Sequence, residues 1–195
     1  MRDRVLELIA KRGGYVRSRD LRAAGVHPSV LPTLERAGRL VRLKRGLYAL
    51  PTRTAREERM EALLGVPGSV LCLGSALSYH RLTTWEPREV YLAIQAGRRV
   101  VLPDAPPIRL FHFAAPTFTL GLTEVRARGG TLRLYDAERT VCDLFRFRHR
   151  LGRDLASEAL RDYLKRPRRR INTMLEYAAK LHVLGRLRAS LEALL

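Results

Sequence analysis

The sequence predicts an α+β fold built in two parts, and three observations predict it. Short segments with helical spacing of apolar residues fill the first 37 positions, a basic hairpin pattern follows them, and residues 137–194 return to helical patterns after a series of short apolar strands. The 195 residues are 46% hydrophobic, which is enough for a buried core and excludes a wholly disordered chain.

The first fifty residues begin with two expected helices. Apolar spacing predicts a helix over residues 3–12, and Gly13 and Gly14 end it. A short extended link follows. Ser18 is a suitable N-cap for a second helix over residues 19–24, because its hydroxyl can accept a hydrogen bond from an N–H group of the first turn.

A third helix is expected over residues 30–37, with Ser29 as its N-cap. Pro32 then falls at the third helical position, where the backbone N–H has no partner within the helix and its absence costs little. Two short strands, residues 40–43 and 47–50, follow and are joined by a basic turn that contains glycine.

Three helices followed by a hairpin are typical of a winged helix-turn-helix, whose third helix enters the major groove of DNA. We expect this DNA-binding domain over residues 1–52. Residues 1–50 carry 12 basic and 4 acidic side chains, a net charge of +8, which favours DNA over the alternative of a winged helix used only for protein contacts. The residues expected to contact DNA are His27, Ser29, Val30, Thr33 and Arg36 around the third helix, and Arg42, Lys44 and Arg45 on the wing.

The remaining residues, 53–195, predict a second domain in which a small mixed sheet packs with a helical C-terminal region. Thr54 and Glu57 have the spacing of a capping box at the start of a helix that runs to about Leu64. Strands are expected at residues 69–73, 89–94, 100–102, 108–113, 122–126 and 132–135. Further helices are expected at residues 76–81, 137–148, 154–165, 171–182 and 184–194.

The composition has a large excess of positive charge. Lys and Arg number 37 against 19 Asp and Glu, a formal net charge of +18. A bias towards Arg codons explains the choice of Arg over Lys but not the shortage of carboxylates. Such a charge attracts polyanions, so nucleic acid is the expected partner, ahead of an anionic membrane surface. No apolar segment approaches the roughly 20 residues of a spanning helix, and no secretory leader opens the chain, so we expect a cytoplasmic protein without a membrane partner.

Three short segments of the chain resemble a known family. They are RGLYALP at residues 45–51, SALSYHRLT at residues 75–83 and DAERTVCDL at residues 136–144. In this order they are similar to the AbiEi-type antitoxins, transcriptional regulators of viral defence (abortive infection) systems. The resemblance implies a winged helix that represses a shared promoter and an AbiEi-like C-terminal domain that counteracts a toxin. It also implies that a nucleotidyltransferase-like toxin is encoded next door and forms no stable complex with its antitoxin.

Two carboxylate patterns could carry chemistry. Asp143 lies in an apolar helical segment, and Arg139 is one turn earlier, so we interpret the two as a structural ion pair rather than as part of a catalytic or metal site. Asp104, followed by Glu124 and Arg126, faintly resembles a metal-dependent nuclease motif, but Arg stands where a Lys should orient the attacking water. The five His and two Cys show no metal-ligand spacing, so neither a metal nor a cofactor is expected.

Basic residues are also concentrated near the C-terminus. A first group comprises Arg146, Arg148, His149, Arg150 and Arg153, and the nearby Phe145 and Phe147 are expected to pack rather than to stack on bases. A second group, expected to form an anion-binding or toxin-related surface, comprises Arg166, Arg168, Arg169 and Arg170. The alternative is a solvated loop whose cations favour the end of the preceding helix.

Together these patterns favour a DNA-binding antitoxin and transcriptional autorepressor of an AbiE-like phage-defence toxin–antitoxin system. We expect it not to be an enzyme. Its expected partners are double-stranded operator DNA, bound as an inverted repeat, and the nucleotidyltransferase-like toxin. Two alternatives stay open: a nucleic-acid-processing enzyme with a nuclease-like second domain, and an orphan regulator without a toxin.

Overall fold

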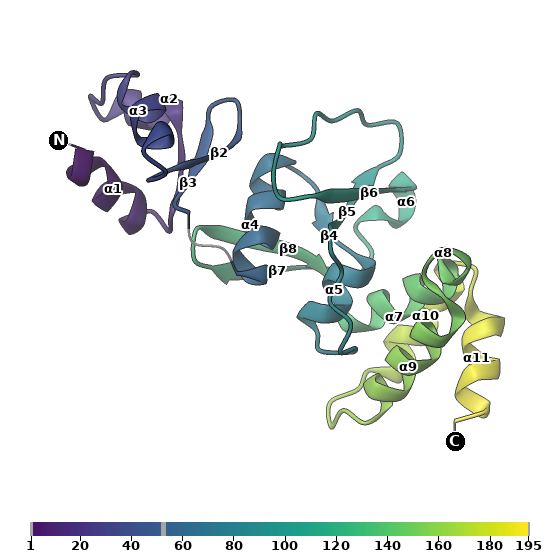
Figure 1. The fold of residues 1–195 in the computed structure, drawn as a ribbon. Coiled ribbons are helices and arrows are strands. Elements are labelled where there is room, and N and C mark those ends of the chain that lie inside the picture. The colour runs from purple at the N-terminus through teal and green to yellow at the C-terminus, as the bar shows by residue number, and fades with distance from the viewer. Residues whose placement is uncertain (1, 52–53, 195) are drawn as a thin grey trace. The chain divides into compact units, whose positions relative to one another are not determined.

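The computed structural model describes residues 2–51 and 54–194 and has an α+β fold, as the sequence predicts (Figure 1). The chain forms two compact units, each described separately below. Unit 1 comprises Met1–Gly68, Arg99–Ile108 and Val125–Leu132, and unit 2 comprises Ser69–Arg98, Arg109–Glu124 and Arg133–Leu195. The boundary expected between residues 52 and 53 lies outside the described residues, and the division at that point stays a prediction.

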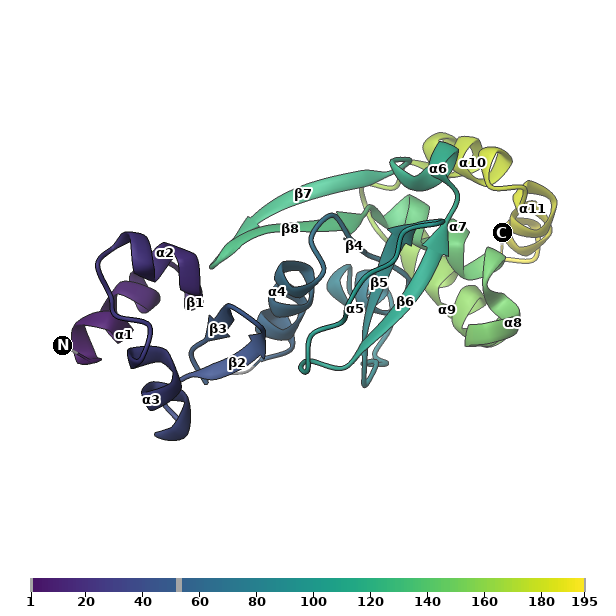
Figure 2. The ribbon, with the colours of Figure 1, turned by 90° about the horizontal axis from the view of Figure 1, so that it is seen from above.

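Unit 1 begins with the three expected helices and the expected hairpin (Figures 1 and 2). The helices are α1 (Arg2–Lys11), α2 (Ser18–Ala23) and α3 (Val30–Arg36), and the strands are β1 (Tyr15–Arg17), β2 (Val41–Lys44) and β3 (Leu47–Ala49). The three strands form an antiparallel sheet in the order β1-β3-β2. Ile9, Leu21, Leu34 and Leu40 are fully buried and belong to one apolar cluster. The arrangement is that of a winged helix-turn-helix.

The extended link expected at Tyr15 and Val16 is confirmed, and it forms strand β1 because its backbone pairs with β3 in register Val16 to Tyr48. Two other local expectations in this segment need correction. Ser18 is the first residue of α2 rather than its cap, and the capping position is held by Arg17, whose side chain makes no capping bond. Ser29 does occupy the position before α3, but its backbone is already helical and its hydroxyl is turned to His27 instead of to the helix.

Unit 1 continues through α4 (Ala55–Gly65), whose expected capping box is confirmed: Thr54 Oγ1 accepts from the Glu57 N–H at 3.3 Å, and Glu57 Oε2 accepts from the Thr54 N–H at 2.8 Å. The strand expected at residues 100–102 is wrong. This segment runs as a loop, in which the Asp104 N–H donates to the Leu43 carbonyl at 2.9 Å and the following prolines offer no N–H for a ladder.

A close approach of two backbones explains one of the glycines that end α1. A Cβ built on Gly13 would lie 2.3 Å from the backbone nitrogen of Gly129, and the φ of Gly13 is +86°. No side chain fits at this distance, and an L-residue would also be strained at this φ. Gly13 therefore ends α1 and allows the turn around Gly129, within the Val125–Leu132 segment of unit 1, to pack there.

Unit 2 is built on a mixed five-stranded sheet in the order β6-β5-β4-β8-β7, with β4 antiparallel to β5 and parallel to β8. The strands are β4 (Val70–Leu71), β5 (Val90–Gln95), β6 (Ile108–Phe113), β7 (Leu122–Ala127) and β8 (Gly130–Tyr135). The helices are α5 (Leu73–Tyr79), α6 (Ala115–Phe118), α7 (Ala137–Arg146), α8 (Arg148–Leu151), α9 (Arg153–Leu164), α10 (Ile171–Lys180) and α11 (Leu184–Glu192). The helical C-terminal region follows the sheet as predicted.

Three boundaries in unit 2 differ from expectation. The first strand is only Val70–Leu71, and α5 begins at Leu73 rather than at residue 76. The helix expected over residues 137–148 ends at Arg146, and α8 follows as a separate turn. The short helix α6 was not expected. A large apolar cluster of the unit packs around α7, in which each residue from Ala137 to Phe145 is buried. Among the described helices, none has the length and apolar character that would let it cross a bilayer.

Candidate nucleic-acid interface

Helix α3 is held by its apolar side, which leaves the opposite side for a partner. Leu31 and Leu34 are buried against α1 and the sheet residues of unit 1. His27, Ser29 and Arg36 are exposed. The two other expected base-reading residues, Val30 and Thr33, are partly buried. The structure thus brings the five expected residues together on α3 and the turn before it.

Hydrogen bonds fix the N-terminal end of α3. Nδ1 of His27 lies 2.8 Å from the Ser29 hydroxyl oxygen and accepts the Ser29 N–H at 3.3 Å. This favours the tautomer that carries its proton on Nε2, which leaves Nε2–H as a donor on an exposed ring. The Thr33 hydroxyl donates to the Ser29 carbonyl at 2.9 Å, so towards a partner it acts as an acceptor. The end of the helix is therefore preorganised.

The three cations of the wing have two different roles. Arg42 and Arg45 are exposed, and Arg45 lies in the β2–β3 turn next to Gly46, whose φ is +78°. Lys44 is partly buried, and its ammonium donates to the Val101 carbonyl at 2.9 Å and to the Gly65 carbonyl at 3.3 Å. Lys44, the last residue of β2, thus ties the turn end of the wing to the rest of unit 1, and Arg42 and Arg45 are the wing cations that face solvent.

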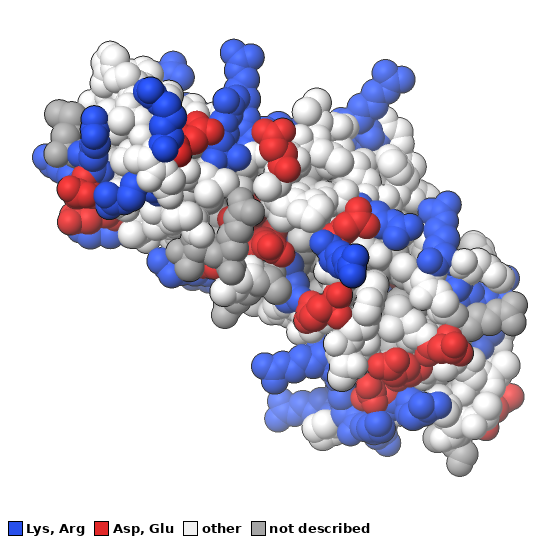
Figure 3. Space-filling model, in the orientation of Figure 1, with Lys and Arg blue, Asp and Glu red and all other residues white. Residues whose placement is uncertain are grey.

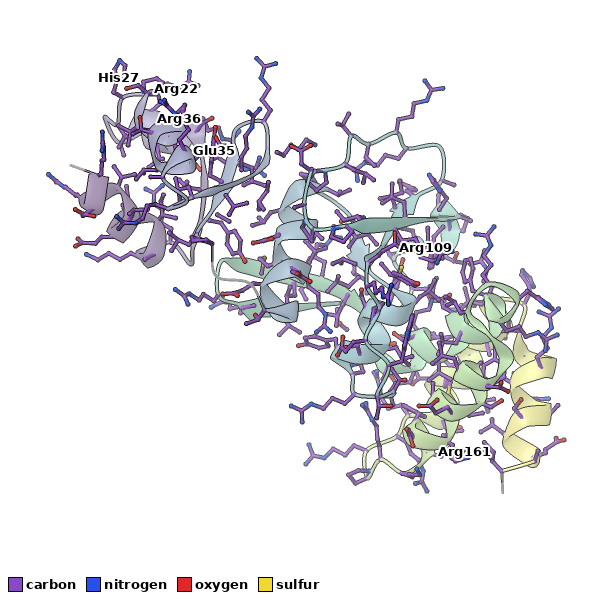
Figure 4. All side chains as sticks on the ribbon, viewed as in Figure 1. Arg22, His27, Glu35, Arg36, Arg109 and Arg161 are labelled. Carbon is purple, nitrogen blue, oxygen red and sulfur yellow. The ribbon has the colours of Figure 1, made fainter. Side chains whose placement is uncertain are left out.

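Arg22 on α2 is an exposed cation that sequence reasoning did not select. Figure 4 labels Arg22, His27, Glu35 and Arg36 in the part of unit 1 that contains α2 and α3. Arg22 and His27 also line the same small cavity, of about 160 Å³. The signal was available: in a helix-turn-helix the helix before the recognition helix crosses the DNA backbone, so an exposed Arg on it is a candidate for a phosphate contact. Figure 3 shows Lys and Arg side chains over this part of the molecule, with fewer carboxylates among them.

The second basic group, in the loop between α9 and α10, is largely engaged within unit 2. An Nη atom of Arg166 donates to the His80 carbonyl, and Nη1 of Arg169 donates to the Leu164 carbonyl at 2.6 Å. Nη2 of Arg170 is 3.1 Å from Asp136 Oδ2, and Nε of the same side chain is 3.1 Å from Glu138 Oε1. Arg168 is exposed. Three of the four residues therefore hold the loop against unit 2, and an anion-binding role for the group stays a prediction.

The carboxylates that Arg170 contacts are almost fully buried, with Asp136 6% and Glu138 3% exposed. Burial raises the pKa of Asp136. At Glu138 burial also acts to raise the pKa, but hydrogen bonds from Arg170 and from the Tyr163 hydroxyl, at 2.7 Å, lower it below its ordinary value. Glu138 is therefore a charged group whose partners are all supplied by this chain.

The expected Arg139–Asp143 ion pair is present and both side chains are fully buried. Arg139 Nε lies 2.8 Å from Asp143 Oδ2, and Arg139 Nη1 donates to the Thr117 carbonyl at 2.7 Å and the Leu120 carbonyl at 2.9 Å. These bonds join α7 to the segment around α6. Because neither side chain has exposed surface, neither can meet a substrate, and the structural interpretation of Asp143 is confirmed.

The residues of the nuclease-like pattern do not form a cluster. Glu124 is 3.2 Å from Arg133 Nε, whereas Asp104 belongs to unit 1. Within the described part of the chain, no group of three or more His, Cys, Asp or Glu side chains could hold a metal ion.

Comparison with known proteins agrees with this geometry. Residues 3–51 match the family model described as "Transcriptional regulator, AbiEi antitoxin", and over these residues the resemblance predicted from the sequence is confirmed. The fold resembles the crystal structure of the RV2827C protein from Mycobacterium tuberculosis, with a TM-score of 0.57 and 18% identity over 94% of this chain and 75% of that one. No curated protein matches the chain significantly. The family match supports a DNA-binding antitoxin and regulator, a regulatory rather than catalytic role.

Proposed function

We propose that this protein is the antitoxin and transcriptional autorepressor of an AbiE-like toxin–antitoxin system for phage defence, paired with a nucleotidyltransferase-like toxin. The observation that carries the proposal is the winged helix of unit 1, whose exposed end bears Arg22, His27 and Arg36 and whose wing bears Arg42 and Arg45. The family match over residues 3–51 supports it.

In this proposal the N-terminal end of α3 enters the major groove. The Nε2–H of His27 and the hydroxyl oxygens of Ser29 and Thr33 are then a donor and two acceptors for base edges. Arg22 on the preceding helix and Arg45 on the wing contact phosphates on either side of the groove. The inverted-repeat operator places one such domain on each half-site.

The antitoxin role is assigned to the second domain, residues 53–195, which counteracts the toxin without a stable complex. The two domains then have separable tasks, since the winged helix has an apolar cluster of its own. Loss of DNA contacts should relieve repression of the operon but leave cells protected from the toxin. A fragment that ends at about residue 52 should bind DNA weakly and give no protection.

The DNA-binding part of the proposal is tested by fluorescence anisotropy with the duplex upstream of the gene and a random duplex of equal length, over a range of salt concentrations. We expect tighter binding to the upstream duplex and a steep loss of affinity with salt. Arg22→Ala and Arg45→Ala should weaken binding to both duplexes and each lower the salt slope by about 1. Arg188→Ala, at an exposed position on α11, is the matched control and should leave binding unchanged. Equal affinity for the two duplexes at moderate salt would exclude a specific repressor.

The antitoxin part is tested by inducing the neighbouring toxin gene in cells that carry the full chain, the 1–52 fragment or no antitoxin. We expect survival only with the full chain. Rescue by the fragment would place antitoxicity in unit 1. A genome with no nucleotidyltransferase-like gene beside this one would make the protein an orphan regulator.

A further inference from the structure

Unit 2 contains a concave site that the proposed function does not use. It lies between strand β6, the end of α7 and helix α8, and its volume is about 480 Å³. His112 comes from β6, Arg146 from α7, and His149 and Arg150 from α8, while Phe111 and Phe147 supply its apolar wall. None of the side chains that line this β6–α8 pocket is an Asp or a Glu.

The guanidinium groups of the pocket are positioned by aromatic rings rather than by carboxylates. Cζ of Arg146 is 5.5 Å from the ring centroid of Phe147 and 5.7 Å from that of Phe113, and Cζ of Arg150 is 6.0 Å from the Phe147 centroid. The Phe113 and Phe147 rings are stacked, with centroids 5.6 Å apart and planes at 15°. Stacking on a ring face fixes a guanidinium in place and leaves its in-plane N–H groups to bind an anion.

One of these N–H groups lacks an acceptor. Nη1 of Arg146 is buried and has no hydrogen-bond acceptor among the described residues. Asp143 acts on Arg146 electrostatically; its Oδ2 accepts the Nε–H of Arg139, and its Oδ1 is buried and makes no hydrogen bond to the described residues. This contrasts with Arg170, whose guanidinium meets two buried carboxylates. The Arg146 guanidinium is therefore not neutralised by a hydrogen-bonded carboxylate, and its charge can attract an anion to the pocket.

We propose that the β6–α8 pocket binds a phosphate group of a nucleotide, either free or within a single strand. Phosphate oxygens accept hydrogen bonds in the plane of a guanidinium group. The guanidinium groups of Arg146 and Arg150 both lie over the ring of Phe147. The volume is in the usual range for a site that takes a small ligand. Strand β6 is the edge of its sheet, so no further strand covers it (Figure 2). Figure 3 shows Lys and Arg side chains where Figure 1 places β6 and α8.

The proposal is tested on the full chain by following its histidine ring signals in NMR spectra while ATP, pyrophosphate or a ten-nucleotide single strand is added. We expect the signals of His112 and His149 to shift saturably with ATP and pyrophosphate, and that of His27 in unit 1 to stay in place with these two small anions. A shift with the single strand alone would identify the strand as the source of the phosphate. No shift of His112 and His149 with any of the three probes would overturn the proposal.

Substitutions distinguish binding at the β6–α8 pocket from the general attraction of anions to a basic protein. Arg150→Gln, at an exposed position, should retain the fold and weaken ATP binding about tenfold, the effect of one lost charge-assisted contact. Arg146→Gln combined with Arg150→Gln should abolish the shifts of His112 and His149. Arg188→Gln removes the same charge from α11 and should leave binding unchanged. An equal loss in the Arg188 and Arg150 variants, or retained shifts in the double variant, would refute the site.

Discussion

Removing one member of the buried Arg139–Asp143 pair should destabilise unit 2 more than removing both. Asp143→Ala leaves a buried guanidinium that keeps its two carbonyl acceptors, so we expect the lower end of the usual range for a broken buried pair, about 3 kcal/mol. Arg139→Met removes the bonds to Asp143, to the Thr117 carbonyl and to the Leu120 carbonyl, so its cost should reach about 5 kcal/mol. Replacing both by Met and Leu removes the donor of the Leu120 carbonyl, whereas the Thr117 carbonyl still accepts the Leu120 N–H at 3.4 Å, so the cost should be about 1 to 2 kcal/mol.

These variants form a double-mutant cycle that urea unfolding and melting temperature can measure. For a chain of this length, 3 kcal/mol corresponds to a melting temperature about 6–12 °C lower. Burial, the largest influence on Asp143, raises its pKa, and Arg139→Met removes the opposing charge. The folded variant then binds a proton that the unfolded chain releases, so Arg139→Met should be less destabilised at pH 5 than at pH 8. Additive effects in the cycle, or single variants within 1 kcal/mol of the wild type, would refute the reasoning.

Three further predictions concern charges that the structure separates by role. Arg170→Glu should lower the melting temperature by several degrees, because it places a third carboxylate beside two buried ones, whereas Arg168→Glu should leave the melting temperature unchanged. Thermal unfolding of both variants tests this difference, and equal effects would contradict the prediction. Burial lowers the pKa of His80, so the wild type should lose stability as pH falls below about 6.5. His80→Gln keeps a donor for the Tyr135 carbonyl and should lose less stability over the same pH interval. Urea midpoints at pH 7.5 and 5.5 measure the difference. Lys44→Met should lower the stability of the protein with little change in the salt slope of DNA binding, whereas Arg45→Ala should lower the salt slope with little change in stability. Anisotropy and melting curves of both variants test this pair of expectations.

Features set by short-range spacing could be predicted from the sequence. The capping box of Thr54 and Glu57 depends on a three-residue spacing, and the Arg139–Asp143 pair depends on one helical turn. The order of three helices and a hairpin in unit 1 likewise follows from local apolar spacing. Of two serines with good capping character, Ser18 was misassigned, because residues 15–17 were drawn into a sheet by β3 and α2 begins at Ser18 itself. Ser29 takes the predicted N-cap position of α3, but its hydroxyl bonds to His27 instead of to the helix.

Contacts between distant segments could not be predicted in the same way. Arg170 and Glu138 are 32 residues apart, and Lys44 and Val101 are 57 apart. Nothing in the local sequence distinguishes these two cations from Arg168 and Arg45, which stay exposed. A row of basic residues indicates attraction to anions, but tertiary packing decides which of them remain available.

The cations of this chain fall into two groups, those bound within the fold and those that stay exposed, and this difference bears on the proposed recognition of DNA. Lys44 and Arg170 serve the fold, and they act through carbonyls and carboxylates of the same chain. Arg22, Arg36 and Arg45 are exposed, and they lie on α2, α3 and the wing, the three elements that meet DNA in a winged helix. Net charge alone would draw the whole molecule to any polyanion. A preference for one duplex sequence must come from the few groups whose positions are fixed, and at the end of α3 the bonds among His27, Ser29 and Thr33 fix them before DNA arrives.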